Sequence, residues 1–253
     1  ILSNLIFQGV DHIDWQINPK IEAKFMLKAL IKYGSTAIPM HFSIFNIPIR
    51  IAVQLKIPYV IYGENSAFEY GNKDKKELGF ELNKKWINRY GVTQGTSIHS
   101  WYDKSMTAKD MLSYLPPSEK ELKKSNVKAI FLGHYIKWDP RLTKNFASKY
   151  GFKFPKKPRI GFYNYADIDD DFISIHHWLK WYKFGFTRLF DNLSIEIRNG
   201  RITRDKAIKI IKKDKFEPPI KDIEKFCNFT NITIKKFFEI AEKYRNKKIW
   251  IKD

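Results

Sequence analysis

Two apolar runs dominate the hydrophobic pattern of this chain. IPYVIYG (57–63) and VKAIFLG (127–133) are continuous, contain β-branched residues and end in glycine. Runs of this kind are typical of strands buried on both faces of a parallel sheet. The alternation of apolar and polar residues in VDHIDWQIN (10–18) predicts one more strand.

Helical patterns separate these runs. Asn18 and Pro19 form a helix start, and Gly34 is a typical helix stop. Ser118 and Glu121 have the spacing of a capping box, which predicts a short helix after them. Helices are expected over 20–33, over 35–56 after an initial turn and with an interruption or kink near Pro48, over 80–90 and over 105–114.

The pattern changes after about residue 160. No strand is convincing there, and helices are predicted over 168–186, 188–198, 204–214, 220–228 and 232–245. Strands that alternate with helices, followed by helices alone, favour two regions. We therefore expect an α/β domain with a parallel sheet over residues 1–160, followed by a helical region over 161–253.

The beginning of the chain predicts a missing N-terminal piece. It opens at Ile1 without an initiator methionine, and Leu2, Leu5 and Ile6 form an apolar segment with no room for a cap before Gly9. We expect catalytic loops to lie in such a piece.

The charge balance is strongly basic. The 46 Lys and Arg residues exceed the 27 Asp and Glu residues, which gives a formal net charge of +19, and the excess is largest in the middle third. A nucleotide, an acidic sugar or a nucleic acid would suit this surface. The alternative is a generally lysine-rich surface, and because basic and aromatic positions do not interleave, nucleic acid is the less favoured partner.

Cysteine and hydropathy usage exclude several classes of protein. The single cysteine, Cys227, excludes a disulfide framework and a CxxC zinc site, and its apolar neighbours predict a buried core thiol. No run of 18 apolar residues is present, and the first residues lack the features of a signal peptide. We expect a cytoplasmic protein that does not enter a membrane.

The first candidate site follows the run 57–63. Gly63, Glu64 and Asn65, with Glu69 and Tyr70 close behind, come at the carboxyl end of a predicted buried strand. Ligands of open α/β sheets bind at such ends, where glycine lets backbone N–H groups approach a phosphate. The alternative is a glycine turn with solvated polar residues.

A second candidate follows the run 127–133. Lys137 would suit a phosphate, while Tyr135 and Trp138 would stack on a base or sugar. The competing interpretation is a strand-to-helix loop in which Asp139 caps a helix opened by Pro140. The sequence leaves these two alternatives open.

The third candidate lies in the predicted helix over 168–186. Asp169, His176, Lys180 and Lys183 are spaced by 7, 4 and 3 residues and would share one face, beside an apolar face. We interpret this polar stripe as the lining of a pocket in which His176 contacts substrate. Asp167 and Asp170 are candidate magnesium ligands, although carboxylates at a helix start are also favoured by the helix dipole.

Arginines form the fourth candidate. Arginine is scarce elsewhere, yet it recurs at positions 188, 198, 201 and 204. Bidentate contacts to a carboxylate or phosphate would explain this choice for Arg188, Arg198 and Arg201. Pairing with Asp191, Glu196 and Asp205 within the chain explains it equally well.

Three segments give the chain a family resemblance. IPYVIYGENSAFEYG, AIFLGHYIKWDP and above all the long segment that runs from YADIDDDFISIHHW to RNGRITRDKAI resemble the N-acetyl sugar amidotransferases of bacterial surface-polysaccharide and nonulosonic-acid biosynthesis. That family belongs to the PP-loop ATP pyrophosphatases. Its Ser-Gly-Gly-x-Asp-Ser-type phosphate loop is not among these 253 residues, so residues 1–160 would be the C-terminal part of a PP-loop domain.

The resemblance implies a reaction and its partners. ATP would adenylate the amide oxygen of an N-acetyl sugar, ammonia would replace AMP, and the acetamido group would become acetamidino. ATP and Mg²⁺ would be the cofactors. A separate glutaminase subunit would supply ammonia, together with a cyclase homologue like that of histidine biosynthesis.

From position we assign roles within this picture. Glu64, Asp169 and His176 are the candidate catalytic residues. The candidate nucleotide- and substrate-binding residues are Gly63, Asn65, Glu69, Tyr70, Lys137, Lys180, Lys183, Arg188, Arg198 and Arg201. The rival classes are a PP-loop RNA-modifying enzyme, which would bind RNA through the basic middle third, and a non-catalytic binding or assembly subunit.

Overall fold

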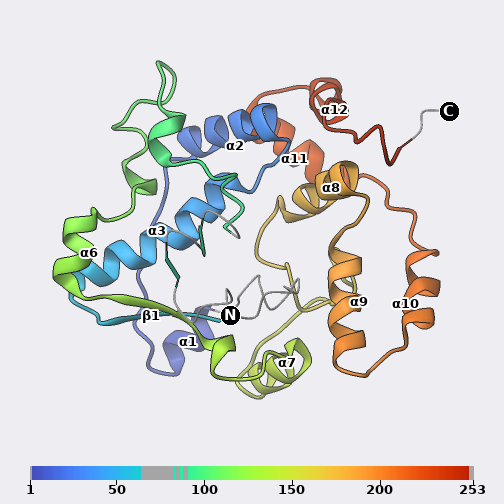
Figure 1. Cartoon of the computed structure of the whole chain (residues 1–253), viewed down its shortest axis with the longest axis horizontal. Coiled ribbons are helices and arrows are strands. Elements are labelled where there is room, and N and C mark those ends of the chain that lie inside the picture. The colour runs from blue at the N-terminus through green and yellow to red at the C-terminus, as the bar shows by residue number, and fades with distance from the viewer. Residues whose placement is uncertain (1, 64–81, 84–85, 88–90, 251–253) are drawn as a thin grey trace. The chain divides into compact units, whose positions relative to one another are not determined.

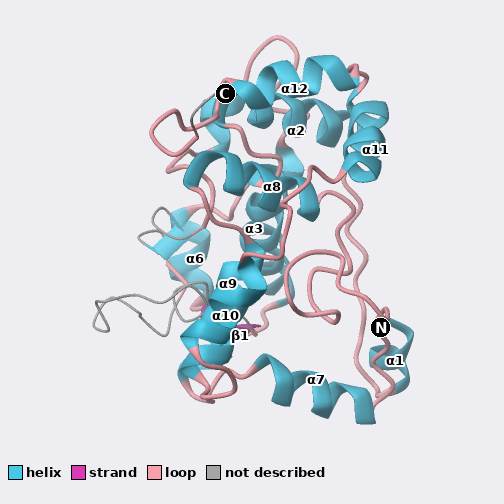
Figure 2. Ribbon diagram, turned by 90° about the vertical axis from the view of Figure 1, so that its right-hand side faces the viewer, coloured by secondary structure: helices cyan, strands magenta, loops and turns pink. Residues whose placement is uncertain are grey.

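The protein is a mixed α/β structure that consists mostly of helices (Figure 2). The computed structural model describes residues 2–63, 82–83, 86–87 and 91–250. It divides into two compact units. The first unit comprises Ile1–Gln16, Trp138–Cys227 and Ile234–Asp253, and the second comprises Ile17–Lys137 and Asn228–Thr233. The expected domain boundary at residue 160 stays a prediction.

The second unit contains a small parallel sheet. Strands β1 (Tyr59–Tyr62) and β2 (Lys128–Phe131) pair with Tyr59 opposite Lys128 and Tyr62 opposite Phe131. On the inner face, Tyr62 and Phe131 pack with Phe45 and Trp86. Both strands lie where the apolar runs predict them.

The outer face of β1 differs from the expectation. Tyr59 is 54% exposed and Ile61 is 61% exposed, so the strand is not buried on both faces. Among the described residues the sheet has only these two strands, and no helix of the described chain covers those two side chains. The apolar run 57–63 therefore predicted the strand correctly, but the prediction that both faces of the strand are buried was wrong.

Two long helices, α2 (Pro19–Tyr33) and α3 (Ile38–Leu55), form the body of the second unit. The Asn18 side chain accepts a hydrogen bond from the backbone N–H of Lys20, and α2 ends at Gly34 with φ of 58°, where glycine is favoured. Pro48 lies inside α3, which is assigned as one helix rather than two. The apolar side of α2 supplies Phe25, whose ring packs on Trp101 and Tyr114.

The remaining elements of the second unit are short. Helix α6 (Glu119–Ser125) begins at Ser118, and the expected capping box with Glu121 is present. The 3₁₀ turns are η2 (Ile98–Trp101), η3 (Leu112–Tyr114) and η4 (Leu132–His134).

Two predicted elements are absent. Residues 10–18 do not form a strand. Val10 and Ile13 are more than half exposed, so the apolar positions of the alternating pattern do not form a buried face. Residues 105–114 form turns and η3 instead of an α-helix. There the carboxylates of Asp103 and Asp110 accept nearby backbone N–H groups, and such local bonds compete with a helix. Most of the helix expected over 80–90 lies outside the described residues.

The first unit is helical in its described residues (Figure 1). Helix α9 has the bounds predicted for it, whereas α8 begins five residues later than expected. The helices are α1 (Leu2–Phe7), α7 (Pro140–Lys149), α8 (Ile173–Phe184), α9 (Arg188–Arg198), α10 (Arg204–Ile211), α11 (Ile220–Thr230), whose end from Asn228 on is counted with the second unit, and α12 (Ile234–Glu242).

Aliphatic and aromatic side chains pack between the helices of the first unit. Leu189 and Leu193 of α9 pack with Ala207 of α10, and Figure 1 shows the two helices side by side. Phe226 of α11 packs edge-on against Phe237 of α12. Cys227 is buried, as expected for a core thiol. None of the helices in the described chain is sufficiently long and apolar to cross a membrane.

Candidate functional site

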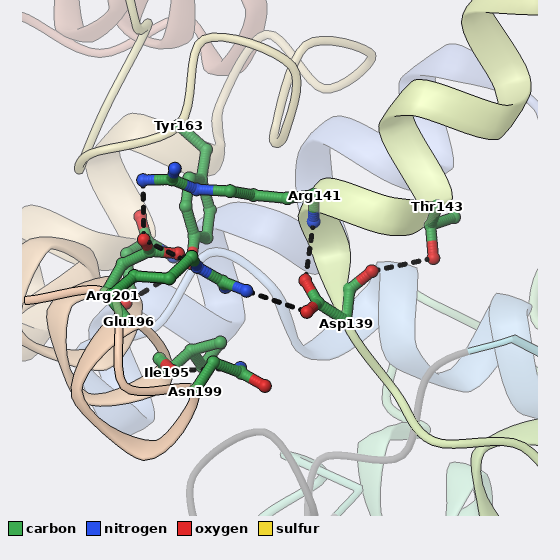
Figure 3. A network of polar contacts seen from close by, with 9 residues as sticks. Asp139, Arg141, Thr143, Tyr163, Ile195, Glu196, Asn199 and Arg201 are labelled. Carbon is green, nitrogen blue, oxygen red and sulfur yellow. Dashed lines mark hydrogen bonds and ion pairs between the residues drawn. The ribbon is translucent and has the colours of Figure 1, made fainter.

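A buried carboxylate organises the first unit. Glu196 on α9 has no exposed surface. Its oxygens accept hydrogen bonds from the Tyr163 hydroxyl at 2.6 Å and from Nη2 and Nε of Arg201 at 2.7 and 2.9 Å, and Arg141 of α7 lies 2.5 Å away (Figure 3). Burial raises the pKa of Glu196, but the bonds from Arg201 and Tyr163 outweigh that effect and hold the pKa below its usual value. Glu196 is therefore an ionised and fully partnered carboxylate.

Asp139 extends this network to the start of α7. One carboxylate oxygen accepts the backbone N–H of Arg141, and the other accepts Nη1 of Arg201 at 2.7 Å (Figure 3). Asp139 therefore caps α7, in agreement with one of the two interpretations of this segment. Arg201 thus links the start of α7 to Glu196 on α9.

A second buried cluster lies around Asp167. Nε of Arg188 donates to Asp167 at 2.7 Å, and Nε2 of His177 is 3.9 Å from the same carboxylate, beyond hydrogen-bonding distance. Asp167 adopts a left-handed backbone conformation with φ of 55°, which is uncommon outside glycine and asparagine. Burial raises the pKa of Asp167, while His177 and Arg188 lower it by more, so it lies below its usual value.

His177 is the buried histidine of α8. The residue is 3% exposed, and its Nδ1 atom has no hydrogen-bond partner among the residues that the structure describes. Burial lowers the pKa of His177, and the positive charge of Arg188 lowers it further. The imidazole is therefore held neutral beside a carboxylate that is already bound to an arginine.

Helix α8 also carries Lys180 and Lys183, two of the cations predicted to line a pocket. Lys180 binds Asp191 of α9 at 2.5 Å, and its ammonium lies over the Phe186 ring at 4.6 Å. Burial lowers the pKa of Lys183 to about 8. Two of the sequence-predicted cations are thus half-buried.

A cavity of about 360 Å³ adjoins the Glu196 network. Tyr163 and Tyr165, stacked with ring centroids 5.0 Å apart, form one wall. Arg141 and Lys144 of α7 supply positive charge, and the remaining lining includes Asn145 and Asn164. Aromatic faces, amides and cations suit a polar ligand that carries a sugar ring and a negative charge. We call this cavity the tyrosine cavity.

The structure separates the sequence-predicted residues into groups. Asp167, Lys180, Lys183, Arg188 and Arg201 all lie in the first unit, and each pairing described above is internal to it. Gly63 ends β1 and Lys137 follows η4, both as exposed residues of the second unit. Glu64, Asn65, Glu69 and Tyr70 lie outside the described residues.

The predicted polar stripe of α8 is only partly formed. Asp169 precedes the helix and is exposed, so it shares no helical face with His176. His176 is half-buried with its ring edge-on to that of His177. His176 was the residue predicted to contact substrate, whereas His177 is the more deeply buried of the two, because its side of α8 packs into the unit.

The aspartates before α8 do not cap it as the helix-dipole interpretation expected. The residue before the helix is Phe172, and no acidic residue lies in the first turn of α8. Asp170 instead accepts the backbone N–H of Phe172 in a local turn. Within the described ranges, no three His, Cys, Asp or Glu side chains gather as a metal site requires.

Arg198, at the end of α9, is exposed, and Arg204 begins α10. Arg201 pairs with Glu196, as the intramolecular alternative proposed, whereas Asp191 pairs with Lys180 rather than an arginine. Tyr163, which belongs to both the Glu196 network and the tyrosine cavity, was not predicted as a site residue. No periodic pattern or motif around it pointed to such a role.

The comparison with protein families matches this unit. Residues 142–253 match the family model described as LPS biosynthesis protein WbpG-like, C-terminal domain. The match spans somewhat less than half of the chain and supports a lipopolysaccharide-biosynthesis family. It covers most of the first unit, including Tyr163, Glu196 and Arg201. No curated protein matches the chain.

Replacement of Glu196 by glutamine should strongly destabilise the first unit. Glu196→Gln leaves Arg201 with Asp139 as its only carboxylate partner among the described residues and removes the counter-charge of the half-exposed Arg141, which we expect to lower the free energy of unfolding by about 2–3 kcal/mol. Glu239→Gln removes an exposed ion pair with Lys236 and should cost less than about 1 kcal/mol. Urea unfolding followed by circular dichroism measures both, and similar losses in the two variants would contradict the assigned role of Glu196.

Stability should depend on pH through His177. Because burial lowers its pKa in the folded state, the unfolded chain binds a proton at this residue below about pH 6.5 while the folded chain does not. The free energy of unfolding should therefore fall as the pH drops below that value. In His177→Gln the slope between roughly pH 5 and 7 should be smaller by up to about 1.4 kcal/mol per pH unit.

His12, an exposed histidine of the same unit, is the matched control for this experiment. His12→Gln should leave the slope unchanged. Equal slopes in His177→Gln and the unmodified protein would show that His177 does not contribute.

Proposed function

We propose that this chain is part of an ATP-dependent amidotransferase that converts the acetamido group of a sugar to an acetamidino group in lipopolysaccharide or related surface-polysaccharide biosynthesis. The observation that carries the proposal is the family match over residues 142–253, together with the tyrosine cavity inside that stretch. The amidotransferase chemistry itself comes from the resemblance of the three segments quoted above.

The proposed reaction replaces one poor leaving group by a good one. The amide oxygen attacks the α-phosphorus of ATP and pyrophosphate leaves. Ammonia then adds to the activated carbon, the C–O bond to AMP breaks, and the added nitrogen loses a proton to give the amidine. Ammonia would come from a glutaminase partner, with the cyclase homologue as a further partner.

In this proposal the residues of the first unit bind the sugar. The Tyr165 ring, backed by the buried Tyr163, offers an apolar face to the pyranose, and Lys144 offers an ammonium to an acidic or phosphate group. Arg141 is tied to Glu196 and holds the wall in place. The candidate catalytic roles of Glu64, Asp169 and His176 remain proposals.

The side chains proposed for Mg²⁺ do not build a site for it here. Asp167 binds Arg188 at 2.7 Å, and a guanidinium at that distance repels a divalent cation. Asp170 faces the backbone N–H of Phe172. Neither carboxylate is therefore assigned to Mg²⁺, which the assay below contains because ATP chemistry requires it.

Turnover with candidate sugars tests the proposed function. The protein is incubated with ATP, Mg²⁺, ammonium and an N-acetylated nucleotide sugar, and the sugar is analysed by mass spectrometry. Conversion of acetamido to acetamidino lowers the mass by about one unit, with AMP and pyrophosphate formed in equal amounts. The assay uses the 253-residue chain and, separately, the protein with any chain that precedes Ile1, each with and without the glutaminase partner.

The outcomes separate the rival classes. ATP-dependent loss of about one mass unit supports the proposal. Modification of RNA in place of sugar supports the RNA-modifying class, and the absence of turnover in every preparation supports a non-catalytic binding subunit; either result contradicts the amidotransferase assignment.

Lys144 provides a test of the tyrosine cavity. Lys144→Gln removes a cation that lines the cavity and should raise KM for an acidic or phosphorylated N-acetyl sugar about tenfold, with kcat little changed, because a charged contact is worth about 1.5–3 kcal/mol. Lys149→Gln, on the same helix but outside the cavity, is the control and should leave KM unchanged. Equal KM values in the two variants would remove the cavity from the substrate site.

A further inference from the structure

A second cavity lies in the first unit and is strongly basic. It measures about 620 Å³, and its lining includes Lys153, Lys157, Arg159 and Lys225, together with Phe154 and Asp222. Four cations thus face a single carboxylate of the lining. None of these residues was among the candidate site residues predicted from the sequence.

The positive charge of this cavity is only partly neutralised by nearby carboxylates. Asp222 accepts Nη2 of Arg159 at 3.1 Å and the Ser174 hydroxyl at 2.5 Å. Asp171 pairs with Arg159 at 3.2 Å and with Lys225 at 3.3 Å. Lys153 and Lys157 are exposed, and neither forms an ion pair with any part of the chain that the structure describes. The cavity therefore keeps an excess of positive charge, which favours an anionic ligand.

Arg159 is held in place before any ligand binds. Its Nη2 donates to the backbone carbonyl of Asp171 at 2.8 Å as well as to Asp222. Its Nε is buried and has no hydrogen-bond partner among the described residues. The guanidinium is thus anchored through Nη2, and its side chain is 22% exposed, so it adds a positive charge of fixed position to the cavity lining.

The basic cavity and the tyrosine cavity meet at one aromatic wall. Phe154 lines the basic cavity and packs edge-on against Tyr165 of the tyrosine cavity, with ring centroids 6.0 Å apart. The ammonium of Lys144 lies 5.2 Å from the Phe154 ring. The two cavities are therefore neighbours, separated by the Phe154 and Tyr165 rings.

We propose that the basic cavity binds a diphosphate group through Lys153, Lys157 and Arg159. A diphosphate carries several negative charges on tetrahedral oxygens, which matches flexible ammonium groups beside one fixed guanidinium. Phe154 supplies the flat apolar surface on which an attached ring packs. The identification of this diphosphate as that of a nucleotide-linked sugar rests on the proposed function, whereas the diphosphate site itself does not.

Direct binding measurements test the site without any turnover. Isothermal titration calorimetry is carried out with inorganic pyrophosphate, ADP, UDP-N-acetylglucosamine and free N-acetylglucosamine. The variant Lys153→Glu/Lys157→Glu reverses two charges of the cavity. Lys206→Glu/Lys209→Glu on α10 makes the same change in net charge at exposed positions outside both cavities.

Pyrophosphate should bind the unmodified protein, and its Kd should rise about tenfold or more in Lys153→Glu/Lys157→Glu while changing less than about twofold in the control. An equal rise of the pyrophosphate Kd in both variants would show that only the net charge of the protein matters, and would overturn the proposed site. Failure of pyrophosphate to bind the unmodified protein at about 1 mM would overturn it as well.

The four ligands also distinguish the source of the diphosphate. Tighter binding of UDP-N-acetylglucosamine than of pyrophosphate, weakened by Lys144→Gln as well, assigns the cavity to a nucleotide sugar that spans both cavities. Tighter binding of ADP assigns it to the ATP side of the reaction. Diphosphate binding without turnover in any preparation would keep the site and reject the proposed function.

Discussion

The burial of the Glu196 carboxylate is the constraint on which the first unit depends. A carboxylate without exposed surface loses its hydration, at a cost of several kcal/mol unless the fold supplies donors. These donors come from separate parts of the chain: Arg201 follows α9, Arg141 lies on α7, and Tyr163 lies in the intervening segment. Because only the folded chain brings them together, the network fixes three segments relative to one another.

The arginines and lysines of the first unit occupy different kinds of site, and the need to pair buried carboxylates explains where the arginines lie. The arginines make internal contacts: Arg201 with Glu196, Arg188 with Asp167, and Arg159 with Asp222. A planar guanidinium donates in several fixed directions and is less strongly hydrated than an ammonium, so it suits buried carboxylates.

Lysines, by contrast, line the two cavities. Lys144 lines the tyrosine cavity, and Lys153 and Lys157 line the basic cavity. The preference for arginine at a few positions of a lysine-rich chain therefore reflects the fold, while the positive charge offered to a ligand comes mainly from residues that composition alone could not single out.

The sequence predicted those features that local chemistry determines. The ends of α9, the capping box at Ser118, the Gly34 stop of α2 and the positions of the two strands all follow from signals within a few residues. It failed where distant packing decides. The exposed face of β1, the later start of α8 and the choice of His177 over His176 depend on which segments reach those positions.

Asp167 illustrates why the candidate site was only partly predictable. Its type and position made it a candidate metal ligand, but its left-handed backbone turns the carboxylate towards Arg188 and His177, and no periodic pattern encodes that turn. Likewise, the sequence contains Tyr163 and Phe154 without any motif that joins them to a site.

One chain of contacts connects the ionic network to both cavities. Glu196 accepts the Tyr163 hydroxyl, Tyr163 stacks on Tyr165, and Tyr165 packs against Phe154. Rings held in this way have few alternative rotamers, so the wall between the cavities is positioned before a ligand enters, and less conformational entropy remains to be lost on binding. The buried carboxylate thus acts on both cavities without lining either, because it orients the aromatic wall that the two cavities share.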